Sequence, residues 1–239
     1  INMCISCGVC VETCPVKALS FKDGKVVWDD KKCCGCDTCI KTCPNNSSPK
    51  IKYMSAEEIW EKIEGNLPFI RGITVSGGEC TLQADVVREL FAIARKHGLT
   101  TLLDSNGSYD FRNHPELMEV SDGVMLDVKA DSEERHQWLT GHSIDIVLEN
   151  LQWLASADKL EEIRTVCIPG SLENEKTIEV AGDILKPYLE KKDIRYKLIK
   201  YRHFGVRQQY RDFKEPSEEY MKSLKRLAEK KGFRNIVII

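Results

Sequence analysis

The sequence predicts an α/β chain, with a small cysteine-rich unit over residues 1–50. Over residues 51–239 it predicts a parallel sheet wrapped by helices, either an incomplete (β/α)6-type barrel or an open sheet. Three observations lead to this fold class. Nine of the eleven cysteines lie between Cys4 and Cys43. From Ser55 onward, strand-like and helix-like segments alternate, which favours a parallel sheet wrapped by helices. The helix expected at 55–65 has no strand of its own before it, so one barrel strand is expected upstream of Ile1.

The composition is that of a globular protein. Charged residues make up 30% of the chain and the hydrophobic set 42%. A net charge of −2 gives no reason to expect nucleic acid or an anionic membrane as a partner. No apolar run approaches the roughly 18 residues of a membrane helix, and no secretory signal opens the chain. We therefore expect a cytoplasmic protein.

The cysteine-rich unit needs a metal to hold it together. Between its two cysteine runs, ALSF and KVVW flank Asp23-Gly24, a strong β-hairpin signal. The unit has too little apolar content for its own core, so metal binding must stabilise it. By composition, the segment 45–50 is a linker to the barrel.

The barrel is expected to contain six strands and seven helices. The SAEE stretch at 55–58 is typical of a capping box, and Gly98 marks a helix end. The expected strands are 69–75, 100–104, 123–129, 162–168, 194–201 and 235–239. The expected helices are 55–65, 81–98, 114–120, 132–141, 143–157, 173–191 (interrupted or ended near Pro187) and 216–232.

Two cysteine runs share the spacing C-x2-C-x2-C-x3-C-P. This is the bacterial ferredoxin spacing for [4Fe–4S] clusters, in which the fourth cysteine of each run binds the other cluster. Zinc is the alternative, but it usually takes two separated cysteine pairs, and a disulfide framework does not suit a chain without a secretory signal. Cys34 lies outside the pattern. The two ligand sets expected are Cys4, Cys7, Cys10 with Cys43, and Cys33, Cys36, Cys39 with Cys14.

Polar groups follow five consecutive strands of the barrel region. The segments are SGGE (76–79), DSNG (104–107), LDVK (126–129), IPG (168–170) and a late His203. In a parallel barrel, the carboxyl ends of the strands form the active-site face. We therefore expect these groups to share one rim.

These motifs, in this order, resemble the radical S-adenosylmethionine (SAM) enzymes that activate glycyl-radical enzymes, in the subgroup with a two-cluster ferredoxin insert. The resemblance runs from Cys4 to the C-terminus and implies a role for each rim residue. Gly77, Gly78 and Glu79 are similar to the turn that binds the SAM amino group. Lys129 and Arg164 are placed like cations that meet carboxylate charge, and His203 like a histidine that contacts SAM. The residues similar to ligands of a monovalent cation are Asp104 and Asp127, with Ser105 and Met125 nearby.

The resemblance also implies a reaction and its partners. SAM is cleaved reductively to a 5′-deoxyadenosyl radical, which takes hydrogen from a glycine loop of a partner glycyl-radical enzyme. The ferredoxin unit relays electrons from a flavodoxin or ferredoxin-type donor, in an anaerobic cytoplasm. The family's C-x3-C-x2-C motif for a third [4Fe–4S] cluster is absent from this sequence. We expect that motif upstream of Ile1, so the chain as given should not cleave SAM.

Two other functions stay open at this point. One is a stand-alone electron-transfer protein, and the other is a radical SAM enzyme that acts on a small molecule. The rim residues also have simpler explanations, such as a tight turn at Gly77-Gly78 or an Asx turn at Asp104. Cys80 and Cys167 are expected as small core residues. The remaining histidines are expected at the surface: His97, His114, His136 and His142.

Overall fold

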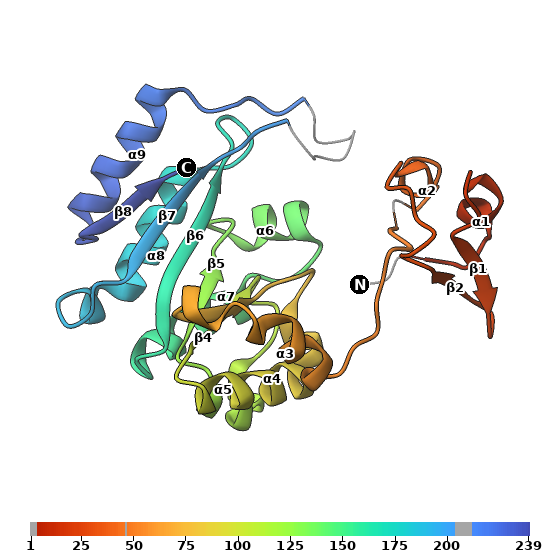
Figure 1. Ribbon diagram of the computed structural model, residues 1–239. Coiled ribbons are helices and arrows are strands. Elements are labelled where there is room, and N and C mark those ends of the chain that lie inside the picture. Colours follow the sequence, from red (N-terminus) through yellow and green to blue (C-terminus); the bar gives the residue numbers. More distant parts are fainter. Residues whose placement is uncertain (1–3, 46, 204–211) are drawn as a thin grey trace. The chain divides into compact units, whose positions relative to one another are not determined.

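The chain forms two compact units, Ile1–Ile59 and Trp60–Ile239. The structure is a computed structural model that describes residues 4–45, 47–203 and 212–239 (Figure 1). The expected boundary at residue 50 falls inside the first unit. Among the described residues, no helix combines the length and apolar character needed to cross a membrane.

The first unit contains two short helices and a β-hairpin. The hairpin consists of β1 (Leu19–Lys22) and β2 (Lys25–Trp28), paired antiparallel. Asp23 and Gly24 connect the strands with φ of 51° and 73°, as a two-residue type I′ turn requires. The predicted hairpin is therefore confirmed. The two helices, α1 (Val9–Thr13) and α2 (Thr38–Lys41), each begin inside one of the cysteine runs.

The two cysteine runs are related by a shift of 29 residues, and their helices meet at equivalent positions. The Thr13 and Thr42 hydroxyls lie 3.2 Å apart. Each hydroxyl also donates to the carbonyl four residues earlier, at 2.8 Å to Val9 and 2.9 Å to Thr38. The buried core of this unit is small and consists largely of thiols: Cys10, Cys14, Ala18, Leu19 and Cys39.

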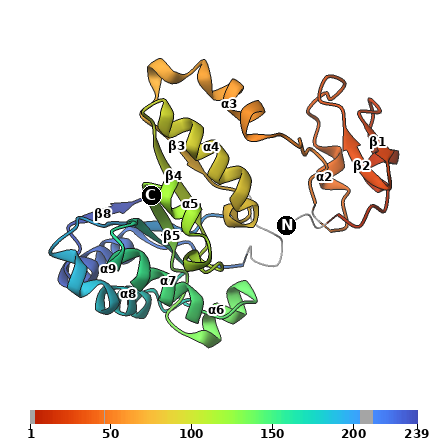
Figure 2. The ribbon, with the colours of Figure 1, turned by 90° about the horizontal axis from the view of Figure 1, so that it is seen from below.

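The second unit is built on a six-stranded parallel sheet whose spatial order follows the chain. Each strand pairs in parallel with the next, so all carboxyl ends lie along one edge (Figure 2). The predicted parallel α/β fold with six strands is confirmed. The strands are β3 (Gly72–Val75), β4 (Thr100–Ser105), β5 (Gly123–Asp127), β6 (Leu160–Cys167), β7 (Arg195–Lys200) and β8 (Asn235–Ile238).

In the described part of the chain, seven helices accompany this sheet, and local sequence explains several of their ends. Ser55 and Glu58 form a reciprocal capping box, because each side chain accepts a hydrogen bond from the other's backbone N–H, at 2.8 and 3.2 Å. Gly98 has a φ of 74° just beyond α4. The helices are α3 (Ala56–Glu64), α4 (Ala84–Lys96), α5 (Pro115–Val120), α6 (Glu133–Thr140), α7 (Asp145–Ser156), α8 (Asn174–Leu189) and α9 (Glu218–Lys230), with 3-10 turns η1 (Leu67–Phe69), η2 (Cys80–Gln83) and η3 (Phe111–Asn113).

The two faces of the sheet differ in polarity, because side chains alternate along each strand. One face carries fully buried apolar residues that pack against α4, α5, α7, α8 and α9, such as Leu103, Leu126, Ile163 and Leu198. The alternate positions carry Met125 and the charged side chains of Asp104, Asp127, Glu162, Arg164 and Lys197. The charged face is therefore the one available for chemistry.

Three local predictions were wrong. Strand β3 begins at Gly72 and not at 69, because Leu67–Phe69 forms a 3-10 turn with a proline at its start. Helix α8 continues through Pro187 to Leu189, since a proline in the last turn removes only one hydrogen bond there. His136 is buried, and its Nδ1 lies 2.8 Å from the His142 carbonyl oxygen.

Candidate functional site

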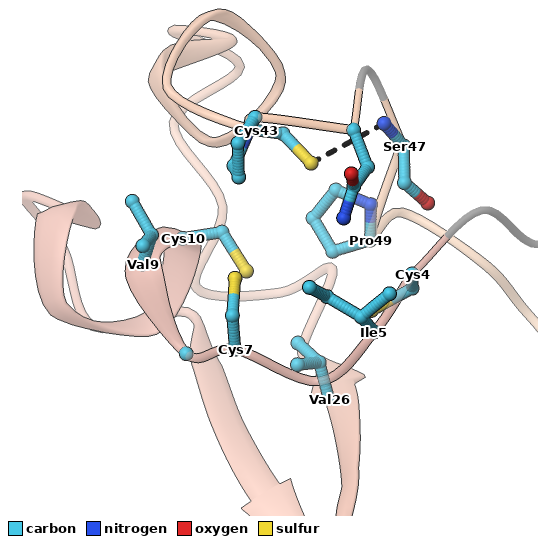
Figure 3. A pocket seen from close by; sticks show the side chains of 12 residues that line it. Cys4, Ile5, Cys7, Val9, Cys10, Val26, Cys43, Ser47 and Pro49 are labelled. Carbon is cyan, nitrogen blue, oxygen red and sulfur yellow. Dashed lines mark hydrogen bonds between the residues drawn. The ribbon is translucent and has the colours of Figure 1, made fainter.

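Two cavities in the first unit are each lined by cysteines from both runs. The first cavity is lined by Cys4, Cys7, Cys10 and Cys43, together with apolar neighbours such as Ile5, Val9 and Val26 (Figure 3). Three of these cysteines come from the first run, and Cys43 comes from the second. The four cysteines predicted to share one cluster thus surround one cavity.

The second cavity is lined by the other predicted set, Cys33, Cys36 and Cys39 with Cys14 from the first run. Its remaining lining includes Trp28, Cys34 and Lys50. Cys34, which the spacing pattern leaves out, therefore lies beside the predicted ligands, and no feature of the spacing indicates this. The two cavities exchange their fourth cysteine, as the bacterial ferredoxin spacing predicts.

The local chemistry of these thiols suits iron–sulfur ligation. Backbone N–H groups point at sulfur, from Ser6 to Cys4 Sγ at 3.4 Å and from Ala18 to Cys14 Sγ at 3.3 Å. The hydroxyl and backbone N–H of Thr38, with the Cys34 thiol, lower the pKa of Cys36 to about 7. These donors favour the thiolate, which is the form that binds metal.

The lowered pKa of Cys33 has a similar origin. Its largest cause is the backbone N–H of Gly35, followed by the indole N–H of Trp28. Within the described residues, no three His, Cys, Asp or Glu side chains converge closely enough for a single metal ion. A cubane suits thiols spread around a cavity, because each thiolate binds a different iron, whereas one zinc needs all four at about 2.3 Å.

At the rim of the sheet, Glu79 joins the ends of two strands. Its Oε1 accepts hydrogen bonds from the Thr81 hydroxyl at 2.8 Å and the Ser105 hydroxyl at 2.9 Å. Its Oε2 accepts from the Asn106 backbone N–H at 2.8 Å. Glu79 follows Gly77, whose φ is 150°, and Gly78 in the turn after β3. The structure thus brings the predicted Gly77–Glu79 turn and Ser105 together through the Glu79 carboxylate.

A second group of rim residues centres on Arg164. Its Nη1 donates to Asp104 Oδ2 at 2.7 Å, and its Nη2 lies 3.0 Å from Met125 Sδ. Its Nε donates to Glu162 Oε1 at 2.5 Å. Three predicted site residues from three strands, Asp104, Met125 and Arg164, are therefore in direct contact.

The remaining predicted residues lie at strand ends without joining this group. Lys129 donates to Asp127 Oδ2 at 2.7 Å. Asp127 is the strand neighbour of Arg164 in the sheet register. His203 follows β7, is half exposed, and lies with its ring 5.4 Å from that of Tyr201 and its Nε2 3.8 Å from Glu215.

Sequence reasoning missed Glu162 and Lys197. Glu162 is only 2% exposed, and the Lys197 ammonium lies 2.9 Å from its Oε1. Burial acts to raise the pKa of Glu162, but its hydrogen bonds to Lys197 and Arg164 outweigh burial and lower that pKa. The signal was present in the strand 160–167, because Glu162 and Arg164 occupy alternate positions on the charged face.

Cys80 and Cys167 are buried, as expected. Cys80 is more than an apolar filler, because its thiol donates to the Asp104 carbonyl at 3.4 Å. Burial, followed by the Glu79 charge, raises the pKa of Cys80 to about 12. The thiol therefore stays neutral and links the Glu79 turn to β4.

Two sequence families match the chain. Residues 3–47 match the 4Fe-4S dicluster domain, and residues 32–181 match the radical SAM superfamily. The chain belongs to the radical SAM superfamily. Its curated relatives at about 30–35% identity are glycyl-radical enzyme activating enzymes, and the chain is a member of this group.

Two relatives illustrate how much of the chain is covered. Pyruvate formate-lyase 1-activating enzyme of Escherichia coli (strain K12) is 35% identical over 170 residues, covering 67% of this chain and 69% of the relative. Choline trimethylamine-lyase activating enzyme of Oleidesulfovibrio alaskensis is 29% identical over 216 residues, covering 86% and 69%. The chain spans between 64% and 69% of the length of the curated relatives that it matches.

Solved radical SAM structures share the fold. A domain of a pyruvate-formate lyase-activating enzyme from Bacteroides vulgatus superimposes with a TM-score of 0.60 at 21% identity, covering 70% of this chain and 98% of that domain. The predicted combination of a radical SAM domain, built on a parallel sheet of six strands, with a ferredoxin-like dicluster domain is confirmed.

Proposed function

We propose that this chain is part of a glycyl-radical enzyme activase. In this reaction, one electron cleaves SAM into methionine and a 5′-deoxyadenosyl radical. That radical then takes a hydrogen atom from a backbone glycine of a partner enzyme, leaving 5′-deoxyadenosine and a glycyl radical. The observation that carries the proposal is the contact of Arg164, Asp104 and Met125 at the carboxyl edge of a radical SAM sheet.

The eight cysteines around the two cavities are proposed to bind two [4Fe–4S] clusters that pass electrons. With four thiolates per cluster, no iron is left open for a substrate. Support comes from the match to a dicluster domain and from the two separate sets of four cysteines. The electron donor is proposed to be a flavodoxin or a ferredoxin-type protein.

The rim residues are proposed to bind SAM through its charges. SAM carries an ammonium, a carboxylate and a sulfonium, so a site with both carboxylates and cations is complementary to it. We assign the ammonium to the Gly77–Glu79 turn, and the carboxylate to Arg164 or Lys129. His203 is proposed to contact SAM from the end of β7.

A monovalent cation is proposed beside SAM. Asp104, Ser105, Met125 and Asp127 lie on two adjacent strands, since Asp104 pairs with Met125 in the sheet register. Oxygen ligands of this kind suit hard cations. Asp104 and Asp127 are now paired with Arg164 and Lys129, so we propose that the cation competes with these side chains.

The cluster that cleaves SAM is proposed to be a third [4Fe–4S] cluster. We propose that a C-x3-C-x2-C motif binds it, and these 239 residues do not contain that motif. The chain alone is therefore proposed to be inactive in SAM cleavage.

The activase proposal is tested by supplying SAM and a strong reductant, without oxygen, to the full-length enzyme with its clusters. The expected products are 5′-deoxyadenosine, quantified by chromatography, and a glycyl-radical signal by electron paramagnetic resonance (EPR) when the partner enzyme is added. Release of 5′-deoxyadenosine without any radical on the partner would exclude the activase function.

The SAM assignment is tested by binding, independently of turnover. Arg164→Met should weaken SAM binding at least tenfold, since a charge-assisted bond contributes about 1.5–3 kcal/mol. Arg195→Met is the matched control, because Arg195 also contacts Glu162, at 3.4 Å, but stands at the start of its strand, away from the rim. Equal affinity in both variants would contradict the assignment.

A further inference from the structure

The two cysteine-lined cavities differ in their electrostatic surroundings. The 29-residue shift that relates the two runs also relates their lining residues. Ile5, Gly8 and Val9 line the first cavity. The shift relates them to Cys34 and Asp37, which line the second cavity, and to Thr38, which contacts the Cys36 thiol there. The comparison below is therefore between matched positions of one repeat.

One backbone donor is the same in both halves. The Ala18 N–H donates to Cys14 Sγ at 3.3 Å, and the equivalent Ser47 N–H donates to Cys43 Sγ at 3.3 Å (Figure 3). These bonds therefore introduce no difference between the two sites.

Side-chain donors distinguish the second cavity. The Thr38 hydroxyl donates to Cys36 Sγ at 3.3 Å. At the matched position of the first run stands Val9, which has no donor. Trp28 also lines the second cavity, and its buried indole Nε1–H lies beside the Cys33 thiol. A buried N–H of this kind is costly unless an acceptor such as a cluster sulfur takes it up.

The charges also differ. Lys50 lines the second cavity with its side chain 20% exposed, and it forms an ion pair with Asp37, whose side chain is 52% exposed. Water screens the more exposed Asp37 carboxylate more than the less exposed Lys50 ammonium, so the pair leaves a net positive potential at the cavity. The first cavity is lined by neutral side chains, of which Asn45 and Ser47 are the polar ones.

Reduction adds negative charge to a cluster, so hydrogen bonds to its sulfurs and a nearby cation favour the reduced form. We propose that the two clusters are unequal, and that the cluster held by Cys14, Cys33, Cys36 and Cys39 has the higher reduction potential because of Thr38, Trp28 and Lys50. An electron that enters the unit then resides on the cluster in the second cavity, and the cluster in the first cavity is reduced only at a lower potential. This inference rests on the proposed binding of two [4Fe–4S] clusters.

The test is a potentiometric titration of the reconstituted protein, followed by EPR. Iron and sulfide are counted first, and about eight irons in the dicluster unit are expected. Fewer than eight irons would overturn the cluster proposal and this inference together. With both clusters present, two separate midpoint potentials are expected, and a single shared midpoint would overturn the inequality alone.

Matched substitutions assign each midpoint to its cavity. Thr38→Val should shift only the higher midpoint, and it should move it downward. Trp28→Phe and Lys50→Gln should do the same. The reciprocal variant Val9→Thr adds a hydroxyl in the first cavity, and it should raise only the lower midpoint. If Thr38→Val loses iron, Val9→Thr still decides the matter. Movement of the wrong midpoint in either variant would overturn the proposal.

Discussion

Replacing the buried carboxylate of Glu162 by an amide tests the charged face of the sheet. The side chain is 2% exposed, and it accepts hydrogen bonds from Arg164 at 2.5 Å and Lys197 at 2.9 Å. Charge-assisted hydrogen bonds contribute about 1.5–3 kcal/mol each, and glutamine retains one neutral acceptor. We therefore expect Glu162→Gln to lower the free energy of unfolding by about 2–4 kcal/mol.

The assay is urea denaturation followed by circular dichroism. Its matched control is Glu161→Gln on the same strand, where the carboxylate is 41% exposed and contacts Lys192. An exposed ion pair contributes at most about 1 kcal/mol, so this variant should unfold close to the wild type. If both variants lose the same free energy, the buried network does not stabilise the sheet as argued.

The pH dependence gives a second measurement on the same variant. The pKa of Glu162 is lowered in the folded protein, because the bonds to Lys197 and Arg164 outweigh the effect of burial. Its contribution is therefore fully present above the pKa of the unfolded side chain, near about 4.3, and is lost as pH falls through the lower folded pKa. The difference in stability between wild type and Glu162→Gln should shrink below about pH 4. If the difference in stability stays constant down to strongly acidic pH, the pKa of Glu162 is not lowered in the folded protein.

Three further predictions concern stability and can be measured in the same way. Gly107→Ala should lower the free energy of unfolding by about 2–4 kcal/mol, because φ is 74° and the added Cβ would meet a buried leucine methyl group at 2.7 Å. Gly98 has the same φ, but an added Cβ would meet no atom within 4 Å, so Gly98→Ala should lower it by only about 1–2 kcal/mol. Asn150→Ala should lower the free energy of unfolding by about 2–4 kcal/mol, because the buried amide donates hydrogen bonds to two carbonyl oxygens, at 3.0 and 2.6 Å. Gln152 on the same helix is exposed, so Gln152→Ala should change that free energy by under about 0.5 kcal/mol. Ser55→Ala should cost about 1 kcal/mol through loss of the capping box, and an unchanged helix end by hydrogen exchange would contradict this.

The parts of the fold that follow from local chemistry could be predicted from the sequence. The Asp23-Gly24 pair determines a hairpin because both residues must take positive φ. The capping box at Ser55 and the stop at Gly98 define helix ends through a few neighbouring atoms. The parallel sheet followed from the alternation of strands and helices, since parallel neighbours need a helical crossover.

The interactions that were missed depend on contacts between distant strands. Glu162 is separated from Lys197 by a helix and a loop, so only the sheet register brings them together. Glu79 was predicted as a ligand, and the structure adds its bonds to Ser105 and Asn106, from the end of the next strand. A sequence pattern places such residues on a face but does not say which partners they meet there.

The exchange of fourth cysteines between the two cavities has a consequence for biosynthesis. Cys4 is the first ligand of the first cavity to be synthesised, and Cys43 is the last. The second cavity needs Cys14, which belongs to the run that is synthesised earlier. During translation, neither site has all its thiols until the second run has left the ribosome. The two sites must therefore mature together, and a protease cut between Cys14 and Cys33 would deprive both of a covalently tethered ligand at once.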